Sequence, residues 1–251
     1  MEVHTGIIEP RGDSKSEALF CSKPPSMYDN LDNYDGADLS DVIVGDNQYI
    51  PIVDQFPYLG SIVARDCTDE KDIDNRIVKA GNAFGSLRKC LFSSTQVRLR
   101  VKGIVYCTFI LSILLYGAES WSLTEILLRK LRNFHHRCLR AMCRVNRKHT
   151  RDHRISNATL LKRLSLKSID CYICKSQLRW AGHVVRMPWE RLPRKMMSSW
   201  VRSKRPRGAP QYTYGRSLYK ALRKAGVDTN TWHELAMDKL KWRAMINDMN
   251  F

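Results

Sequence analysis

The sequence predicts a mainly α-helical protein with a short β-hairpin region near its N-terminus. Apolar residues recur at steps of three and four along most of the chain after residue 67, which is the spacing of one face of an α-helix. Strand-like runs separated by turn residues are confined to residues 38–66. Within the helical part, Val97–Trp121 is so rich in apolar residues that it predicts the central helix of a bundle.

The part before the helices combines an irregular head with two predicted hairpins. Residues 1–37 are polar and are expected to be irregular and partly disordered, with one candidate strand at Glu17–Cys21. Val42–Ile50 places two apolar ends around a Gly-Asp-Asn turn, whose residue types supply the positive φ of a tight hairpin. A second extended pair follows over Phe56–Ala64, so residues 38–66 form the predicted hairpin region.

The first predicted helix covers about Asp69–Phe92. Its apolar stripe consists of Ile73, Ile77, Ala80, Phe84, Leu87 and Leu91. Acidic residues occupy its first turn (Asp69, Glu70 and Asp72) and basic residues its last, and both placements complement the partial charges of the helix ends. A metal site at the acidic turn is less favoured, because a hard metal ion needs oxygens that converge from more than one helix start.

The second predicted helix is the apolar stretch Val97–Trp121. One face carries Val97, Val101, Ile104, Val105, Thr108, Leu111 and Leu115, and the opposite face carries Ile110, Ile113 and Leu114. A helix that is apolar all round must be covered on every side, so we expect a buried rod. Its apolar run is shorter than the roughly 18 residues of a membrane span, and basic residues precede it directly.

The third predicted helix, about Glu125–Val145, has one apolar and one basic face. The apolar face contains Leu127, Leu128, Leu131, Phe134, His135, Cys138, Leu139 and Met142, and the basic face contains Arg129, Lys130, Arg132, His136, Arg137 and Arg140. Three such helices with short links predict an antiparallel bundle over residues 67–146. A basic face with so few acidic partners repels itself, which favours anion binding over a face that is merely solvated.

Residues 147–251 are predicted to form a basic helical extension. The predicted elements are a basic linker at Arg144–Arg154 and helices at about Asn157–Leu164, Ser168–Met187, Gly215–Ala225 and Thr231–Met249. The expected core anchors of the last helix are Trp232, Leu235, Leu240 and Trp242. Lys204, Arg205 and Arg207 lie among two prolines and a glycine, which predicts an exposed basic loop.

The helix at Ser168–Met187 also carries candidate binding residues. Lys175, Arg179 and Arg186 are predicted to line up near one face, with Trp180 and His183 beside them. Arginine next to an aromatic ring suits pairing with phosphates and stacking on bases.

Charge is distributed unevenly along the chain. The 251 residues carry a formal net charge of +17, yet only three basic residues stand against eleven acidic ones up to Gly60. The remainder therefore holds 39 basic and 14 acidic residues. A strongly basic body with interleaved Trp and Tyr favours nucleic acid as the partner, rather than a membrane or a small-molecule substrate.

The sequence contains no recognisable catalytic or metal-binding motif. It lacks a nucleophile elbow, a phosphate-binding loop, a metalloprotease signature and an Asp-Asp pair on a hairpin, so we expect no catalytic residue, metal or cofactor in this chain. A zinc site built from Cys138, Cys143, Cys171 and Cys174 with nearby histidines is less favoured, because these cysteines fall within helical stripes. Without a signal peptide, the eight cysteines are expected as reduced thiols in the nucleus or cytoplasm.

Six motifs occur in order along most of the chain. They are Phe56–Ile62, Asp72–Ile77 with Ala83–Leu87, Leu115–Trp121, Phe134–Arg140, Leu178–Pro188, and Lys204–Gly208 followed by Trp232–Arg243. In this order they resemble the C-terminal part of a non-LTR (LINE-type) retrotransposon reverse transcriptase, and Leu178–Pro188 is the most specific match. The head matches only at Lys15–Glu17.

The resemblance implies the end of the palm, the thumb and a C-terminal extension of an RNA-directed DNA polymerase. The hairpin residues Tyr58, Leu59, Gly60 and Ser61 would act as the primer grip. The polymerase carboxylates of the family lie upstream of the matched motifs, so the chain alone is expected to be inactive, and Mg²⁺ is expected only for the full-length enzyme. The basic helices would follow the template–primer backbone through phosphate contacts, which carry affinity rather than sequence preference.

The predicted partners are therefore RNA, DNA or an RNA–DNA hybrid, bound without sequence specificity. The candidate binding residues are Arg129, Arg132, His136, Arg137, Arg140, Lys175, Arg179, Trp180, His183, Arg186, Lys204, Arg205 and Arg207. Two alternatives stay open. One is a domesticated or relict retrotransposon-derived interaction protein with no nucleic-acid role, and the other is a remnant sequence that does not fold.

Overall fold

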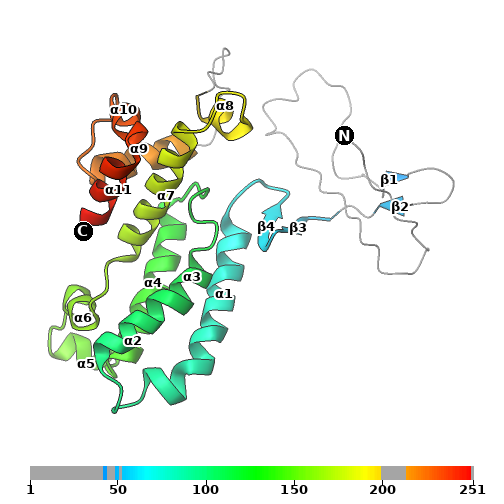
Figure 1. Cartoon of the computed structure of the whole chain (residues 1–251). Helices are drawn as coiled ribbons and strands as arrows, with labels where there is room; N and C mark the ends of the chain where they lie inside the picture. Colours follow the sequence, from blue (N-terminus) through cyan, green and yellow to red (C-terminus); the bar gives the residue numbers. More distant parts are fainter. Residues whose placement is uncertain (1–41, 44–48, 51–52, 199–212, 250–251) are drawn as a thin grey trace. The chain divides into compact units, whose positions relative to one another are not determined.

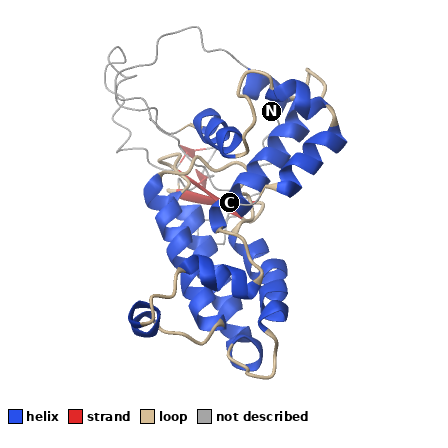
Figure 2. Ribbon diagram, turned by 90° about the vertical axis from the view of Figure 1, so that its left-hand side faces the viewer, coloured by secondary structure: helices blue, strands red, loops and turns tan. Residues whose placement is uncertain are grey.

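The structure, a computed structural model, describes residues 42–43, 49–50, 53–198 and 213–249. These residues fall into two compact units, one ending at Asp72 and the other beginning at Ile73. The described part is mainly helical with two short antiparallel hairpins, which confirms the predicted fold class (Figure 1, Figure 2). No helix in this part has the length and apolar character needed to cross a membrane.

Both predicted hairpins are present. Strand β1 (Val42–Ile43) pairs with β2 (Tyr49–Ile50), while the candidate strand at 17–21 and the Gly-Asp-Asn turn lie outside the described residues. Strand β3 (Gln55–Tyr58) pairs with β4 (Ser61–Ala64) through a two-residue turn. Both turn residues have positive φ, 46° at Leu59 and 89° at Gly60, as a tight hairpin requires. The backbone N–H of Ile62 donates to the Asp72 carboxylate at 3.0 Å, which ties this hairpin to the start of the first helix.

The first predicted helix is confirmed, with a change of geometry near its end. Helix α1 (Glu70–Leu87) continues into a π-helical turn, η2 (Arg88–Phe92). The wider turn brings the buried Phe92 ring onto Phe84, with ring centroids 4.4 Å apart and planes within 8°. This stacking accompanies the burial of Phe92, which lies one position beyond Leu91, the last residue of the predicted stripe.

The prediction of one fully covered rod at Val97–Trp121 is wrong. The segment forms α2 (Leu99–Val105), a π-helical turn η3 (Tyr106–Ile110) and α3 (Leu111–Leu114), and turns follow to residue 120. Val101 and Ile104 of the predicted apolar face are exposed, and so are Phe109 and Tyr116 in the same segment. Lys102, one of the basic residues that directly precede the apolar run, is buried, and its ammonium group donates to the carbonyl oxygens of Ser94 (2.6 Å) and Met142 (3.5 Å). The contact with Met142 satisfies one carbonyl group at the end of the third helix, where the last carbonyl groups have no partner within the helix.

The third helix matches its prediction closely. Helix α4 (Glu125–Met142) begins at Thr124, whose hydroxyl accepts from the backbone N–H of Leu127. Its predicted apolar face is buried apart from the half-buried Leu128. His135 is part of that face, and its Nδ1 lies 2.9 Å from the hydroxyl of the buried Tyr106.

Three details of the C-terminal part differ from the predictions. The helices are α5 (Arg147–Asp152), α6 (Asn157–Leu164), α7 (Ile169–Val185), α8 (Leu192–Ser198), α9 (Tyr214–Lys224), α10 (Trp232–Met237) and α11 (Lys239–Asp248). The predicted linker therefore contains a helix, capped by the Asn146 side chain, and α8 was missed. The predicted last helix is broken at Asp238, which caps α11, and this turns Leu240 outward to 79% exposure. Leu240 is not a core anchor.

The helical unit contains two apolar cores that meet along α7. The N-terminal core joins residues from α1 to the start of α7, and the C-terminal core packs α9, α10 and α11 around the rest of α7 (Figure 1). Gly103 permits a close approach of two helices. A Cβ on Gly103 would lie 2.2 Å from the carbonyl oxygen of Leu164, so α2 and α6 meet backbone to backbone. The domain limits at residues 37, 66 and 146 stay a prediction.

Candidate nucleic-acid interface

An open groove of about 580 Å³ runs between α1 and α4. Its apolar floor contains Phe84 and Phe134, and its α1 wall contains Gly81 and Gly85. A Cβ on Gly85 would meet no atom within 4 Å, so the missing side chain leaves open space at this wall. The groove therefore exists because two small residues stand one helical turn apart on α1, opposite a row of long side chains on α4.

Four arginines supply all the charge of this groove: Arg88, Arg137, Arg140 and Arg147. They come from η2, α4 and α5, and no acidic residue lines the groove. Within the described part of the chain no carboxylate forms an ion pair with any of them. We call these residues the arginine groove.

The arginines are close enough to affect one another. The pKa of Arg140 is lowered, first by burial and then by the positive charges of Arg147 and Arg137. The guanidinium of Arg137 also lies over the Phe134 ring, 5.3 Å from its centroid, which holds it at the groove wall. Converging positive charges without counter-charges are the arrangement that a phosphate chain neutralises.

Other predicted residues of α4 have different environments. Arg129 is exposed, whereas Arg132 pairs in a bidentate fashion with Asp170 (2.6 and 2.8 Å) and also contacts Glu125 at 2.5 Å. Arg132 thus fastens α4 to α7. The pKa of the half-buried His136 is lowered by burial and then by the positive charges of Arg140 and Arg132, which favours the uncharged form of its ring.

The predicted basic row on α7 is not one exposed face. Lys175 is only 8% exposed, and its ammonium group donates to the carbonyl oxygen of Asn247 at 2.9 Å. Arg186 donates to the carbonyl oxygen of Ala236 and so holds α10. Arg179 and His183 are exposed, and the half-buried Trp180 ring lies 5.6 Å from the His183 ring.

The remaining predicted residues either do not line the arginine groove or fall outside the described residues. Tyr58 and Leu59 project from the β3–β4 hairpin with 58% and 76% exposure, next to Gly60 and Ser61. Lys204, Arg205 and Arg207 lie outside the described residues. Arg88 and Arg147 were missed by sequence reasoning, because nothing in their local spacing indicates that η2 and α5 meet α4.

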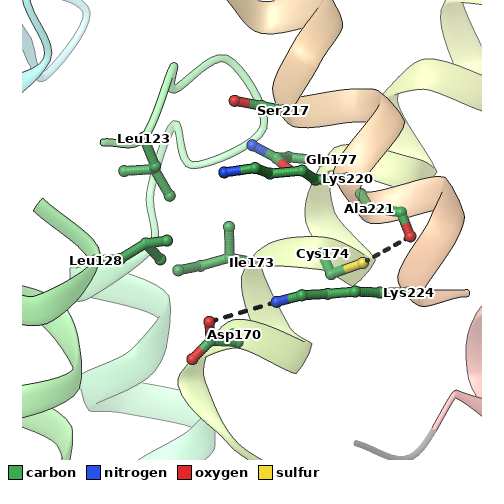
Figure 3. Close-up of a pocket in the computed structure, with 10 residues that line it drawn as sticks. All are labelled: Leu123, Leu128, Asp170, Ile173, Cys174, Gln177, Ser217, Lys220, Ala221 and Lys224. Carbon is green, nitrogen blue, oxygen red and sulfur yellow. Dashed lines mark hydrogen bonds and ion pairs between the residues drawn. The ribbon is translucent and has the colours of Figure 1, made fainter. Parts of the chain in front are cut away.

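A second, smaller pocket lies where α4, α7 and α9 meet (Figure 3). Its volume of about 60 Å³ is enough for a few water molecules but not for a substrate. Asp170 lies at its edge, 3.6 Å from Lys224, and the thiol of Cys174 donates to the carbonyl oxygen of Ala221 at 3.5 Å. The pocket is therefore a small junction between helices, lined by apolar as well as charged side chains.

No group of three or more His, Cys, Asp or Glu side chains converges among the described residues. The Cys171 thiol points to the carbonyl oxygen of Met249, 3.7 Å away, and Cys174 points to α9. The geometry therefore gives no support to the alternative zinc site at these cysteines.

Comparison with known proteins gives one distant relationship. No protein-family model matches the chain, and no solved structure matches it either. The chain is 25% identical over 199 residues to the uncharacterized transposon-derived protein F52C9.6 of Caenorhabditis elegans, a match that covers 77% of this chain and 70% of that protein. The chain is thus distantly similar to a transposon-derived protein.

Proposed function

We propose that this chain binds the phosphate backbone of nucleic acid without sequence preference, and that it is the C-terminal part of a LINE-type reverse transcriptase. The observation that supports binding to the phosphate backbone is the arginine groove, which has four guanidinium groups and no acidic lining residue. A guanidinium presents planar, paired donors that match phosphate oxygens. The open glycine wall gives a sugar–phosphate strand room to enter.

The assignment to a LINE-type reverse transcriptase rests on the order of the motifs and on the similarity to a transposon-derived protein. In this interpretation α1 to α4 form the thumb, and the β3–β4 hairpin is the primer grip. Residues Arg129, Arg179, Trp180 and His183 would extend the contact beyond the groove, together with Lys204, Arg205 and Arg207. The chain would hold template and primer, and the carboxylates and Mg²⁺ of the reaction would belong to the full-length enzyme.

Charge removal in the groove tests the binding. The double variant Arg137→Gln with Arg140→Gln should weaken binding of a fluorescein-labelled blunt duplex, measured by anisotropy across a salt series. The slope of log affinity against log salt should become shallower by about 0.9 for each phosphate contact removed. The matched control Arg191→Gln removes an exposed arginine outside the groove and should leave the slope unchanged.

A charge placed in the groove gives a second test. Gly85→Glu adds a carboxylate where there is open space, so it should weaken duplex binding without lowering the melting temperature. Gly85→Ala should bind as the parent chain does. Equal affinities for the parent, the double variant and Gly85→Glu would refute the groove as the binding site. Primer extension on an RNA template by the purified chain would refute the non-catalytic role.

An interaction protein without a nucleic-acid role is the second candidate. It is favoured by the exposed apolar side chains of Val101 and Ile104 on α2 and Phe109 on η3, and by the exposed Tyr116 in the turn after α3. Apolar side chains left in water at this density are typical of a protein contact. If this candidate is right, the chain does not bind a duplex. It binds a protein partner with an affinity that does not depend on salt, and Phe109→Ser removes that binding.

A further inference from the structure

The outer face of α9 carries an aromatic ring between two arginines, and the arginine groove does not include it. Arg216, Tyr219 and Arg223 follow at steps of three and four, so they share one face of the helix. The inner face is fixed, because Leu218, Ala221 and Leu222 are buried in the C-terminal core. This anchoring turns Tyr219 outward, where it is 50% exposed.

A groove of about 450 Å³ opens along this face. Arg216, Tyr219, Lys220 and Arg223 form one wall, and Thr229 and Asn230 from the following turn form the other. Asp228 shapes that turn, since its carboxylate accepts from the backbone N–H of Asn230 (3.0 Å) and from the hydroxyl of Thr231 (3.3 Å). This carboxylate does not line the groove, whose charged lining residues are all basic.

The chemistry of this wall suits an unpaired nucleotide better than a duplex. In a duplex the faces of the bases are covered by their neighbours, so an exposed ring has nothing to stack on. In a single strand a base can lie on the tyrosine ring while arginines on either side meet its phosphates. The Asn230 side chain on the opposite wall has both a donor and an acceptor for a base edge. An acidic protein segment would engage the arginines but leave the ring unused.

We propose that the α9 groove binds an unpaired nucleotide of single-stranded nucleic acid, with its base stacked on Tyr219 and its phosphates paired with Arg216 and Arg223. This inference rests on the proposed function and adds a preference for a strand end or overhang. The arginine groove then holds the backbone, and the α9 groove distinguishes single-stranded from paired nucleic acid.

Substitution of the ring in the full chain tests the stacking. Tyr219→Ala should weaken binding of a labelled oligothymidylate by about tenfold, as loss of one stacked base does. Its affinity for a blunt duplex should stay within about twofold, since duplex binding is assigned to phosphate contacts. Tyr219→Phe keeps the ring and should bind both probes as the parent chain does. The melting temperature of both variants should be unchanged, because the ring is exposed.

The inference is overturned if Tyr219→Ala binds oligothymidylate as well as the parent chain, if it loses both probes equally, or if Tyr219→Phe behaves like Tyr219→Ala. A photochemical readout is independent of affinity: an oligomer with 5-iodouracil should crosslink to the tryptic peptide that contains Tyr219. Crosslinks to other aromatic residues alone would also overturn it. Failure of the proposed function would appear elsewhere, as unaltered duplex binding by the Arg137→Gln, Arg140→Gln variant.

Discussion

The indole of Trp242 lies directly on the backbone of Gly182: a Cβ atom on that glycine would be 2.1 Å from Nε1 of the ring. The same Nε1–H donates to the carbonyl oxygen of Leu178 at 2.9 Å. Trp242 is 2% exposed, so both contacts are made inside the C-terminal core. The ring of Trp242 on α11 therefore occupies the space of a side chain at Gly182, which makes glycine necessary in the middle of α7.

Gly182→Ala should therefore lower the free energy of unfolding by about 1 to 3 kcal/mol, the usual cost of forcing extra volume into a packed core. Gly85→Ala is the matched comparison, because a Cβ there meets nothing within 4 Å. That variant should stabilise the chain by about 0.5 to 1 kcal/mol through helix propensity. Urea denaturation measures the free energy of unfolding of both variants. Equal urea midpoints for the two variants would contradict the close contact between Trp242 and Gly182.

His135 should make stability depend on pH in the mildly acidic range. Burial, and then the charge of His136, lowers the pKa of His135 to about 4. In the unfolded chain the pKa of a histidine is about 6.5. Above that pH the ring is neutral in both states, so burying it carries no cost from a charge. Stability should therefore fall as the pH drops from about 6.5 toward about 4, because protonation favours the unfolded chain. The urea midpoint of His135→Gln should fall less over this range, and an identical fall would contradict the assignment.

Asp170 should make stability depend on pH in a more acidic range than His135 does. The hydrogen bonds from Arg132 lower its pKa against the opposing effect of burial, with further help from Lys224. The pairing stabilises the folded state fully above the pKa of an aspartate in the unfolded chain, about 3.9. This stabilisation is lost as the pH falls through the lower pKa of Asp170 in the folded chain. Asp170→Asn should cost about 1 to 3 kcal/mol near neutral pH, as expected for charged hydrogen bonds. The cost should shrink in strong acid, and a cost independent of pH would contradict the pairing.

Cysteine reactivity should follow burial. Cys67 and Cys90 are exposed, whereas burial raises the pKa of Cys138 and of Cys174 to about 12. Since the thiolate is the reactive form, iodoacetamide should modify the exposed pair much faster than the buried pair. Mass spectrometry of tryptic peptides gives the order, and denatured protein serves as the control in which all thiols react. Rapid modification of Cys138 in the folded chain would contradict the predicted core of α4.

Local sequence determined most of the segments that become helix or hairpin, and which face of α1 and of α4 turns inward. The stripes of α1 and α4 were predictable because steps of three and four specify one face. Asn157–Leu164 was predicted at its observed bounds, and the structure shows Ser156 as its cap, with the hydroxyl accepting from the backbone N–H of Thr159. The charge asymmetry that favours an anionic partner is likewise a property of the sequence.

Tertiary packing decided which polar groups are used internally and which are left at the surface. Lys102 and Lys175 are charged and look exposed in the sequence, yet each reaches carbonyl groups from a distant segment and is buried. The apolar side chains of Ile104 and Phe109 stay exposed, because the helix bends into π-helical geometry and is covered on one side only. Arg88 and Arg147 join Arg137 and Arg140 only after three elements pack together, so periodicity within one helix cannot predict the arginine groove. Spacing along a helix defines a face, whereas the contacts of that face depend on residues far away in the chain.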